Sequence, residues 1–132
     1  MIFAGSHLIC HWSKTQSTIA LSSGEGEVNA CVKGVSEGIG VHELLVEMGI
    51  PVDLKLELQT DSSAAKGTIT RHGSGKIKHL TIKQLWIQEA IRDYKVDVQK
   101  IPRSVNSADL LTHQCNRSDF DDHLQRLGML RP

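Results

Sequence analysis

The spacing of apolar side chains along the chain predicts a mixture of strands and helices. In residues 54–59 leucine stands at every second position, as in a strand with one covered face. Residues 94–99 alternate in the same way. Between residues 28 and 48, apolar positions instead recur mostly every three or four residues, which predicts a long amphipathic helix. The predicted buried stripe of this helix contains Val28, Cys31, Val32, Val35, Ile39, Leu45 and Met48.

Residues that favour helix ends mark the limits of this long helix. Ser22 or Ser23 is a suitable N-cap, and a glutamate in the first turn suits the positive end of the helix dipole. The helix is expected to end near residues 49–51, a Gly-Ile-Pro sequence. Three internal glycines each weaken the helix by about 1 kcal/mol relative to alanine, so they predict close packing against a sheet. They are Gly34, Gly38 and Gly40.

Shorter patterns in the sequence predict further strands and helices. Residues 2–12 and 17–22 are short runs with apolar residues, and a polar link between them predicts a hairpin. A short helix is expected over residues 62–69 and a longer one over about 80–93. The residues expected to be buried in the longer one are Ile82, Leu85, Trp86 and Ile91.

Two further helices are expected near the end of the chain. Asn106 or Ser107 can cap a short helix that holds Asp109. Ser118 can cap a last helix, which contains Phe120, Leu124 and Leu127. The predicted order is therefore β-β-α-β-α-α-β-α-α, and the predicted class is α/β.

Length, charge and cysteine content narrow the class of protein. At 132 residues the chain is expected to form one domain, with a core over about 2–113 and a helical extension over about 116–130. Fifteen basic and fifteen acidic residues cancel, so the net charge indicates no partner. Three widely spaced cysteines favour a reduced, intracellular protein, in the cytoplasm or the nucleus. No apolar run reaches the ~20 residues of a membrane helix, so no membrane partner is expected.

Local charge is more informative than net charge. Residues 62–88 contain five basic residues and not one carboxylate, and a phosphate backbone suits such a surface. The alternative is an ordinary solvated face. The candidate phosphate contacts are Arg71, Lys76, Lys78 and Lys83.

Three acidic residues stand out, although they lie far apart in the sequence. Asp61 follows the strand over residues 54–59, at the strand end where sites of α/β proteins tend to lie. Glu27 precedes Cys31 and Val35 at four-residue steps, so it is expected at the margin of the buried face, whereas Glu25 is expected to face water. Asp109 follows a possible helix cap. The alternative for Asp61 and Asp109 is helix capping or plain surface charge.

Four motifs resemble, in their order and spacing, the ribonuclease H domain of Ty1/copia-type retrotransposon Pol polyproteins, and the resemblance covers residues 3–113. The first runs from Trp12 to Ser23 and continues into Glu25-Gly26-Glu27. The others are Thr60-Asp61-Ser62, Lys76-Ile77-Lys78-His79-Leu80 and Ala108-Asp109-Leu110-Leu111-Thr112.

The resemblance implies an activity and a set of metal ligands. It implies a ribonuclease H-like mixed sheet flanked by helices, and Mg²⁺-dependent hydrolysis of the RNA strand of an RNA-DNA hybrid at two metal ions. Carried over by motif, the catalytic and metal-binding residues are Glu27, Asp61 and Asp109. His79 becomes a further candidate for nucleic-acid contact, and the alternative for it is packing or capping. His113 stands where the family often has lysine, so it is a weaker candidate.

The resemblance also implies a missing part. The family carries another aspartate on its first, central strand, which would precede the residues matching Phe3 onward. The chain is accordingly expected to lack that strand, to have little or no activity alone, and to need the upstream reverse transcriptase segment of its polyprotein. Exposed strand edges would then favour a homodimer. The alternative function is a non-catalytic remnant that binds nucleic acid or self-associates. Integrase or another nuclease of the same broad fold accounts less well for the motif order.

Overall fold

The computed structural model describes residues 1–14, 20, 22–50, 55–72, 82–111 and 114–129. The chain divides into two compact units. We call Gln16–Lys100 the central unit, and Met1–Thr15 together with Ile101–Pro132 the terminal unit. Each unit is described by itself below.

The central unit is built around a parallel pair of strands. β3 (Glu57–Thr60) and β4 (Asp97–Lys100) pair in register from Glu57 opposite Asp97 to Thr60 opposite Lys100. Parallel strands need a long crossover connection, and here α2 (Ser63–Ile69) and α3 (Ile82–Asp93) lie within it. Both strands predicted from alternating residues are present, but β3 and β4 begin later than the predicted ranges 54–59 and 94–99, and Tyr94 and Lys95 form a turn.

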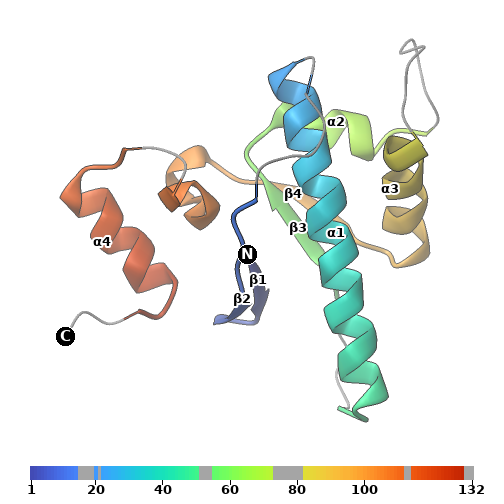
Figure 1. Ribbon diagram of the computed structural model, residues 1–132, viewed down its shortest axis with the longest axis horizontal. Helices are drawn as coiled ribbons and strands as arrows, with labels where there is room; N and C mark the ends of the chain where they lie inside the picture. The colour runs from blue at the N-terminus through green and yellow to red at the C-terminus, as the bar shows by residue number, and fades with distance from the viewer. Residues whose placement is uncertain (15–19, 21, 51–54, 73–81, 112–113, 130–132) are drawn as a thin grey trace. The chain divides into compact units, whose positions relative to one another are not determined.

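The helices cover this strand pair and bury its apolar side. α1 (Ser23–Glu47) contacts β3, α2 and α3, while α2 also contacts both strands (Figure 1). The apolar cluster between them contains Val28, Cys31, Val35, Ala65, Ile69, Ile87, Ala90 and Val98. Ile69 and Ile87 are the largest side chains fully buried in the described part of the chain. The hydrophobic effect is therefore the main stabilising term in the central unit.

Local sequence signals set the ends of α1 as expected. Ser22 is the N-cap, and its Oγ accepts a hydrogen bond from the Glu25 backbone N–H at 3.2 Å. The helix ends at Glu47, and Gly49 adopts a left-handed φ of 69° just beyond it. The predicted buried stripe of α1 is confirmed at its start, where Val28, Cys31 and Val35 are buried. It is wrong at its end, where Met48 is exposed.

Two of the three α1 glycines lie against β3 as expected. A Cβ added at Gly34 would lie 3.7 Å from Leu58 Cδ1, and one at Gly38 would lie 3.9 Å from Leu56 Cδ2. A small hollow lies beside both glycines. The prediction is wrong for Gly40, where an added Cβ meets no atom within 4 Å.

The buried face predicted for α3 is largely wrong. Ile82 is 86% exposed, and Leu85 and Trp86 are exposed as well. The buried residues are Gln84, Ile87, Gln88 and Ala90, with Ile91 partly buried. Apolar residues occur on several sides of this helix, so packing against α1 and α2 decides which side is covered. Gln88 tolerates burial because its Nε2 donates to the Thr68 carbonyl at 2.9 Å.

The terminal unit begins with a hairpin that differs from the predicted one. β1 (Ile2–Ala4) pairs antiparallel with β2 (His7–Cys10), so the expected first strand over residues 2–12 is itself a hairpin. Gly5, with φ 61°, supplies the left-handed conformation that this tight turn requires. Most of the expected partner strand over 17–22 lies outside the described residues.

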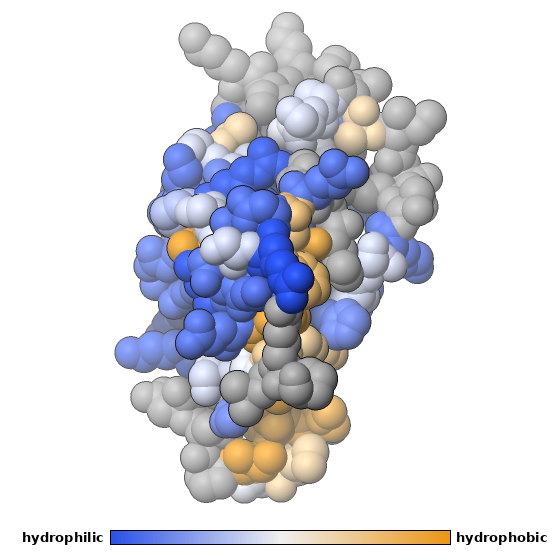
Figure 2. Space-filling view, turned by 90° about the vertical axis from the view of Figure 1, so that its left-hand side faces the viewer, coloured by the Kyte–Doolittle hydropathy of each residue, from blue (hydrophilic) through white to orange (hydrophobic). Residues whose placement is uncertain are grey.

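The rest of the terminal unit is helical. It contains two 3-10 helices, η1 (Arg103–Val105) and η2 (Ser107–Leu111), followed by α4 (Arg117–Arg126). Asn116 caps α4, because its side chain accepts from the Asp119 backbone N–H at 2.8 Å; the prediction of Ser118 is wrong. Figure 2 shows that the surface over α4 is mainly hydrophilic.

The α/β class is confirmed, and so is the element order, except that the first two strands both lie within residues 2–10 and the short helix that holds Asp109 is a 3-10 helix. The described residues form small sheets and four α-helices in the expected order, compatible with a ribonuclease H-like fold. No described helix combines the length and apolar character that a membrane crossing requires.

Candidate functional site

Asp61 lies where β3 ends and α2 begins. It follows Thr60, the last residue of β3, and is half-buried. The Ser62 backbone N–H donates to Thr60 Oγ1 at 3.2 Å, and Ser62 Oγ accepts from the Ala65 N–H at 3.1 Å as the cap of α2. Ser62 therefore does the capping, and the alternative that Asp61 caps this helix is wrong. The carboxylate of Asp61 stands at the carboxyl end of the strand, as predicted.

Glu27 lies near the start of α1, and the predicted burial of Glu25 and Glu27 is the reverse of what the structure shows. Glu27 is exposed, whereas Glu25 is half-buried. The first turn of α1 approaches α2, since a Cβ added at Gly24 would lie 3.8 Å from Ala64 Cβ. Gly24, Glu25 and Gly26 of that turn are partly covered. Helical spacing alone could not reveal which neighbour covers this end of the helix.

The pKa of the Cys31 thiol depends on both Glu27 and Asp61. Burial is the main cause that raises the pKa of Cys31 to about 11, and the negative charges of Glu27 and Asp61 contribute to the same shift. A hydrogen bond between the Thr60 and Cys31 side chains acts in the opposite direction and lowers this pKa. The negative charges of two of the three predicted acids therefore act on the same thiol. These residues are 34 positions apart in the sequence.

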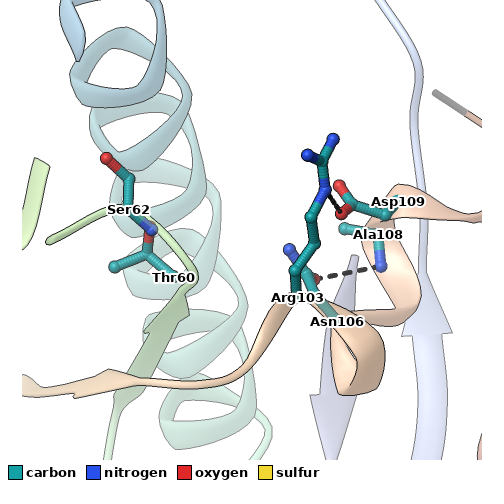
Figure 3. A network of polar contacts seen from close by, with 6 residues as sticks. All are labelled: Thr60, Ser62, Arg103, Asn106, Ala108 and Asp109. Carbon is teal, nitrogen blue, oxygen red and sulfur yellow. Dashed lines mark hydrogen bonds and ion pairs between the residues drawn. The ribbon is translucent and has the colours of Figure 1, made fainter. Parts of the chain in front are cut away.

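Asp109 belongs to the terminal unit and is held by a different set of contacts. It lies in η2 and is half-buried. Arg103 Nε donates to Asp109 Oδ2 at 3.1 Å, which makes an ion pair (Figure 3). The Asn106 side chain accepts from the Ala108 N–H at 3.2 Å, as expected for a residue that starts this short helix.

The chemistry of these side chains suits a hard divalent cation. Carboxylate oxygens are the ligands that Mg²⁺ takes, usually one or two from protein with the rest from water and substrate. Within either unit, the described residues contain no group of three or more His, Cys, Asp and Glu side chains that could hold a metal ion. Glu27 and Asp61 each carry the type of donor atom that Mg²⁺ takes.

The predicted phosphate contacts are only partly described. Arg71 is half-buried just after α2, and Lys83 is exposed on α3. Lys76, Lys78, His79 and His113 lie outside the described residues.

Several residues with functional relevance escaped the sequence interpretation. The Cys31 pKa depends on both acids of the central unit and on a hydrogen bond with Thr60. The sequence contained a signal for both residues, because Cys31 follows Glu27 by one helical turn and Thr60 directly precedes Asp61. Arg92 Nη1 contacts His72 Nδ1 at 3.1 Å. Arg92 is a further cation that lies outside the carboxylate-free residues 62–88. No sequence signal indicates that Arg103 pairs with Asp109.

Comparison with known proteins identifies homologues among retrotransposon polyproteins. The chain is 29% identical over 117 residues to the retrovirus-related Pol polyprotein from transposon TNT 1-94 of Nicotiana tabacum, which covers 89% of the chain and 9% of that protein. It is 24% identical over 132 residues to the retrovirus-related Pol polyprotein from transposon RE1 of Arabidopsis thaliana, covering 99% of the chain and 9% of that protein. No family model matches, and no solved structure matches.

These homologues support an origin in a retroelement polyprotein of the Copia type. The chain spans 9% of the length of each of these two relatives. Most of the length of each relative therefore lies outside the part that resembles this chain.

Proposed function

We propose that this chain is the ribonuclease H portion of a Copia-type retroelement polyprotein. Its reaction is hydrolysis of the RNA strand of RNA-DNA hybrids, carried out in the full-length context. The 132-residue chain alone has little or no activity. The observation that carries the proposal is that the charges of Glu27 and Asp61, which are distant in sequence, both act on the buried Cys31 thiol. The similarity to retrotransposon Pol polyproteins supports it independently.

The side chains divide into two roles in this proposal. Glu27, Asp61 and Asp109 hold Mg²⁺ through carboxylate oxygens. When bound, two such ions supply an activated water and a charge that stabilises the leaving oxygen. Thr60, which directly precedes Asp61, shares a side-chain hydrogen bond with Cys31, and both residues are buried.

A second set of side chains binds the nucleic acid. Cations make contacts with phosphate that position a duplex without reading its sequence. Arg71 and Lys83 supply such charges among the described residues, and Lys76, Lys78 and His79 extend the set, with His113 as a weaker candidate. Two partners follow as proposals. They are the upstream reverse transcriptase segment and, through unpaired strand edges, a second copy of the chain.

Cleavage of a labelled RNA-DNA hybrid in Mg²⁺ tests the proposal. The 132-residue chain is compared with one extended upstream through the expected first strand. We expect activity in the extended chain, reduced more than about a hundredfold by Asp61→Asn, because even residues that only support a metal ligand cost 10- to 100-fold. Asp93→Asn removes the same charge from an exposed position on α3 and is the matched control.

The other outcomes separate the remaining interpretations. Full activity in the short chain would show that no upstream strand is needed. Loss of cleavage in both chains, with the extended chain folded, would favour a non-catalytic remnant. The lack of a three-ligand group within either unit, among described residues, is the observation that favours that second candidate. Its signature is hybrid binding that weakens with salt but is not followed by Mg²⁺-dependent cleavage.

A further inference from the structure

β3 has a hydrogen-bonded neighbour on one side only. It pairs with β4, and the Asp97 N–H donates to the Leu56 carbonyl at 2.9 Å. Backbone groups of successive strand residues point to opposite edges, so the N–H and C=O groups of Glu57 and Gln59 point away from β4. Among the described residues, no hydrogen bond reaches these outward groups. One edge of β3 is therefore open to another strand.

The apolar side chains near the open edge are less well covered than those of β4. Val98 of β4 is buried, whereas Leu56 and Leu58 are only half-buried. α1 faces these two leucines with Gly38 and Gly34, which have no side chain to cover them. A strand added at the open edge of β3 would remove more of this apolar surface from water, which favours its binding.

The sequence around β3 is complementary to itself when two copies run antiparallel, as they do about a two-fold axis. With Leu58 opposite Leu58 of the second copy, Glu57 lies opposite Gln59. The outward backbone groups of these two residues then face each other and can exchange both hydrogen bonds. The same register places Lys55 opposite Asp61, a pair of opposite charges. A register centred on Glu57 would instead bring two carboxylates together.

We infer that β3 pairs antiparallel with β3 of a second copy of the chain, about a two-fold axis at Leu58. The two β3–β4 pairs then form one continuous sheet across the dimer. The inference deepens the proposed function and rests on it for the choice of partner, because that proposal names a second copy. It does not depend on the hydrolysis of nucleic acid.

Analytical ultracentrifugation of the 132-residue chain at several concentrations tests the dimer, for which we expect a monomer–dimer equilibrium. Gln59→Pro removes an outward N–H and should raise the dimer Kd about tenfold or more, because two hydrogen bonds are lost across the two-fold axis. The Asp97 N–H faces β3, so that of Lys100 faces away from it. Lys100→Pro is therefore the matched control on the other edge.

Two outcomes of this experiment would overturn the inference. One is a monomer at every concentration, which would leave the edge to the upstream segment. The other is a dimer that Lys100→Pro disrupts and Gln59→Pro does not. Far-ultraviolet circular dichroism establishes that both variants are folded.

Charge reversal tests the register without altering the backbone. Lys55→Glu should raise the dimer Kd about tenfold, because two attractive pairs become repulsive. Adding Asp61→Lys should restore the dimer, whereas adding Glu57→Lys should not. Restoration by Glu57→Lys instead would place the axis at Leu56 and refute the proposed register.

Assembly and hydrolysis are measured separately, so the inference and the proposed function can fail independently. If the upstream-extended chain cleaves hybrids while the 132-residue chain stays monomeric, hydrolysis stands and the inference is refuted. If the dimer forms and responds to the variants as expected while neither chain cleaves hybrids, the inference stands and the proposed hydrolysis is wrong.

Discussion

The central and terminal units position their acidic residues by different means. In the central unit, Glu27 lies on α1 and Asp61 directly follows β3, two elements that meet at an apolar cluster, and the charges of both acids act on the buried Cys31. In the terminal unit, Asp109 is held by hydrogen bonds and an ion pair with Arg103. Of the buried apolar residues in the described part of the chain, Leu127 alone belongs to the terminal unit.

The difference matters because the two kinds of support respond to different conditions. Apolar burial is not screened by salt and contributes about 25 cal/mol per Å² of area removed from water. An exposed ion pair contributes about 0–1 kcal/mol and weakens as salt increases. We therefore expect Glu27 and Asp61 to keep their relative positions under conditions that release Asp109 from Arg103.

The largest expected effect comes from truncating the core of the central unit. Ile87 is fully buried on α3, so Ile87→Ala should lower the free energy of unfolding by about 2–5 kcal/mol through lost burial and a residual cavity. Urea denaturation followed by far-ultraviolet circular dichroism measures it. Ile82→Ala is the matched control on the same helix, since Ile82 is 86% exposed. Equal losses from both variants would mean that α3 packs by a different face.

A smaller effect is expected from the polar support of the terminal unit. Asn116→Ala removes the N-cap of α4 and should destabilise that helix by about 1 kcal/mol, whereas Asn116→Asp should preserve the cap and suit the helix dipole. Amide hydrogen exchange at Asp119 and Phe120 measures the change. Ser118→Ala should have little effect. If Ser118→Ala were the damaging variant, the cap would lie where the sequence pattern first indicated.

Alkaline pH offers a selective test of the central unit. The folded-state pKa of Cys31 is raised from 9.0 to about 11 by burial and by nearby Glu27 and Asp61. The protonated thiol therefore contributes stability that is fully present below pH 9 and is lost as pH rises toward 11. Between pH 9 and pH 10 the loss should be about 1 kcal/mol.

The Cys31→Ala variant should lack this component of the pH dependence, as measured by urea denaturation at each pH. Cys115→Ala is the control, since Cys115 is exposed in the terminal unit. An identical slope in Cys31→Ala and in the unaltered chain would show that the thiol does not lie in the enclosed, negatively charged environment described above.

Sequence alone determined the elements whose signals are local. The N-cap at Ser22, the end of α1 before Gly49 and the position of Asp61 after β3 depend on residues within a few positions of one another. Backbone hydrogen bonding and side-chain size act over that short range, so the pattern predicts them well. The order of elements and the α/β class followed from the same local signals.

Tertiary structure decided which faces of those elements are covered and which side chains meet. Residues distant in sequence decide which face of α3 is covered and that Glu25 is partly buried. They also explain why the charges of Glu27 and Asp61 both affect the pKa of the Cys31 thiol. Helical periodicity leaves the choice open when apolar residues occur on several sides, as they do on α3. The Arg103–Asp109 pair required the fold of the turn between η1 and η2, because flexible charged side chains leave no periodic trace in a sequence.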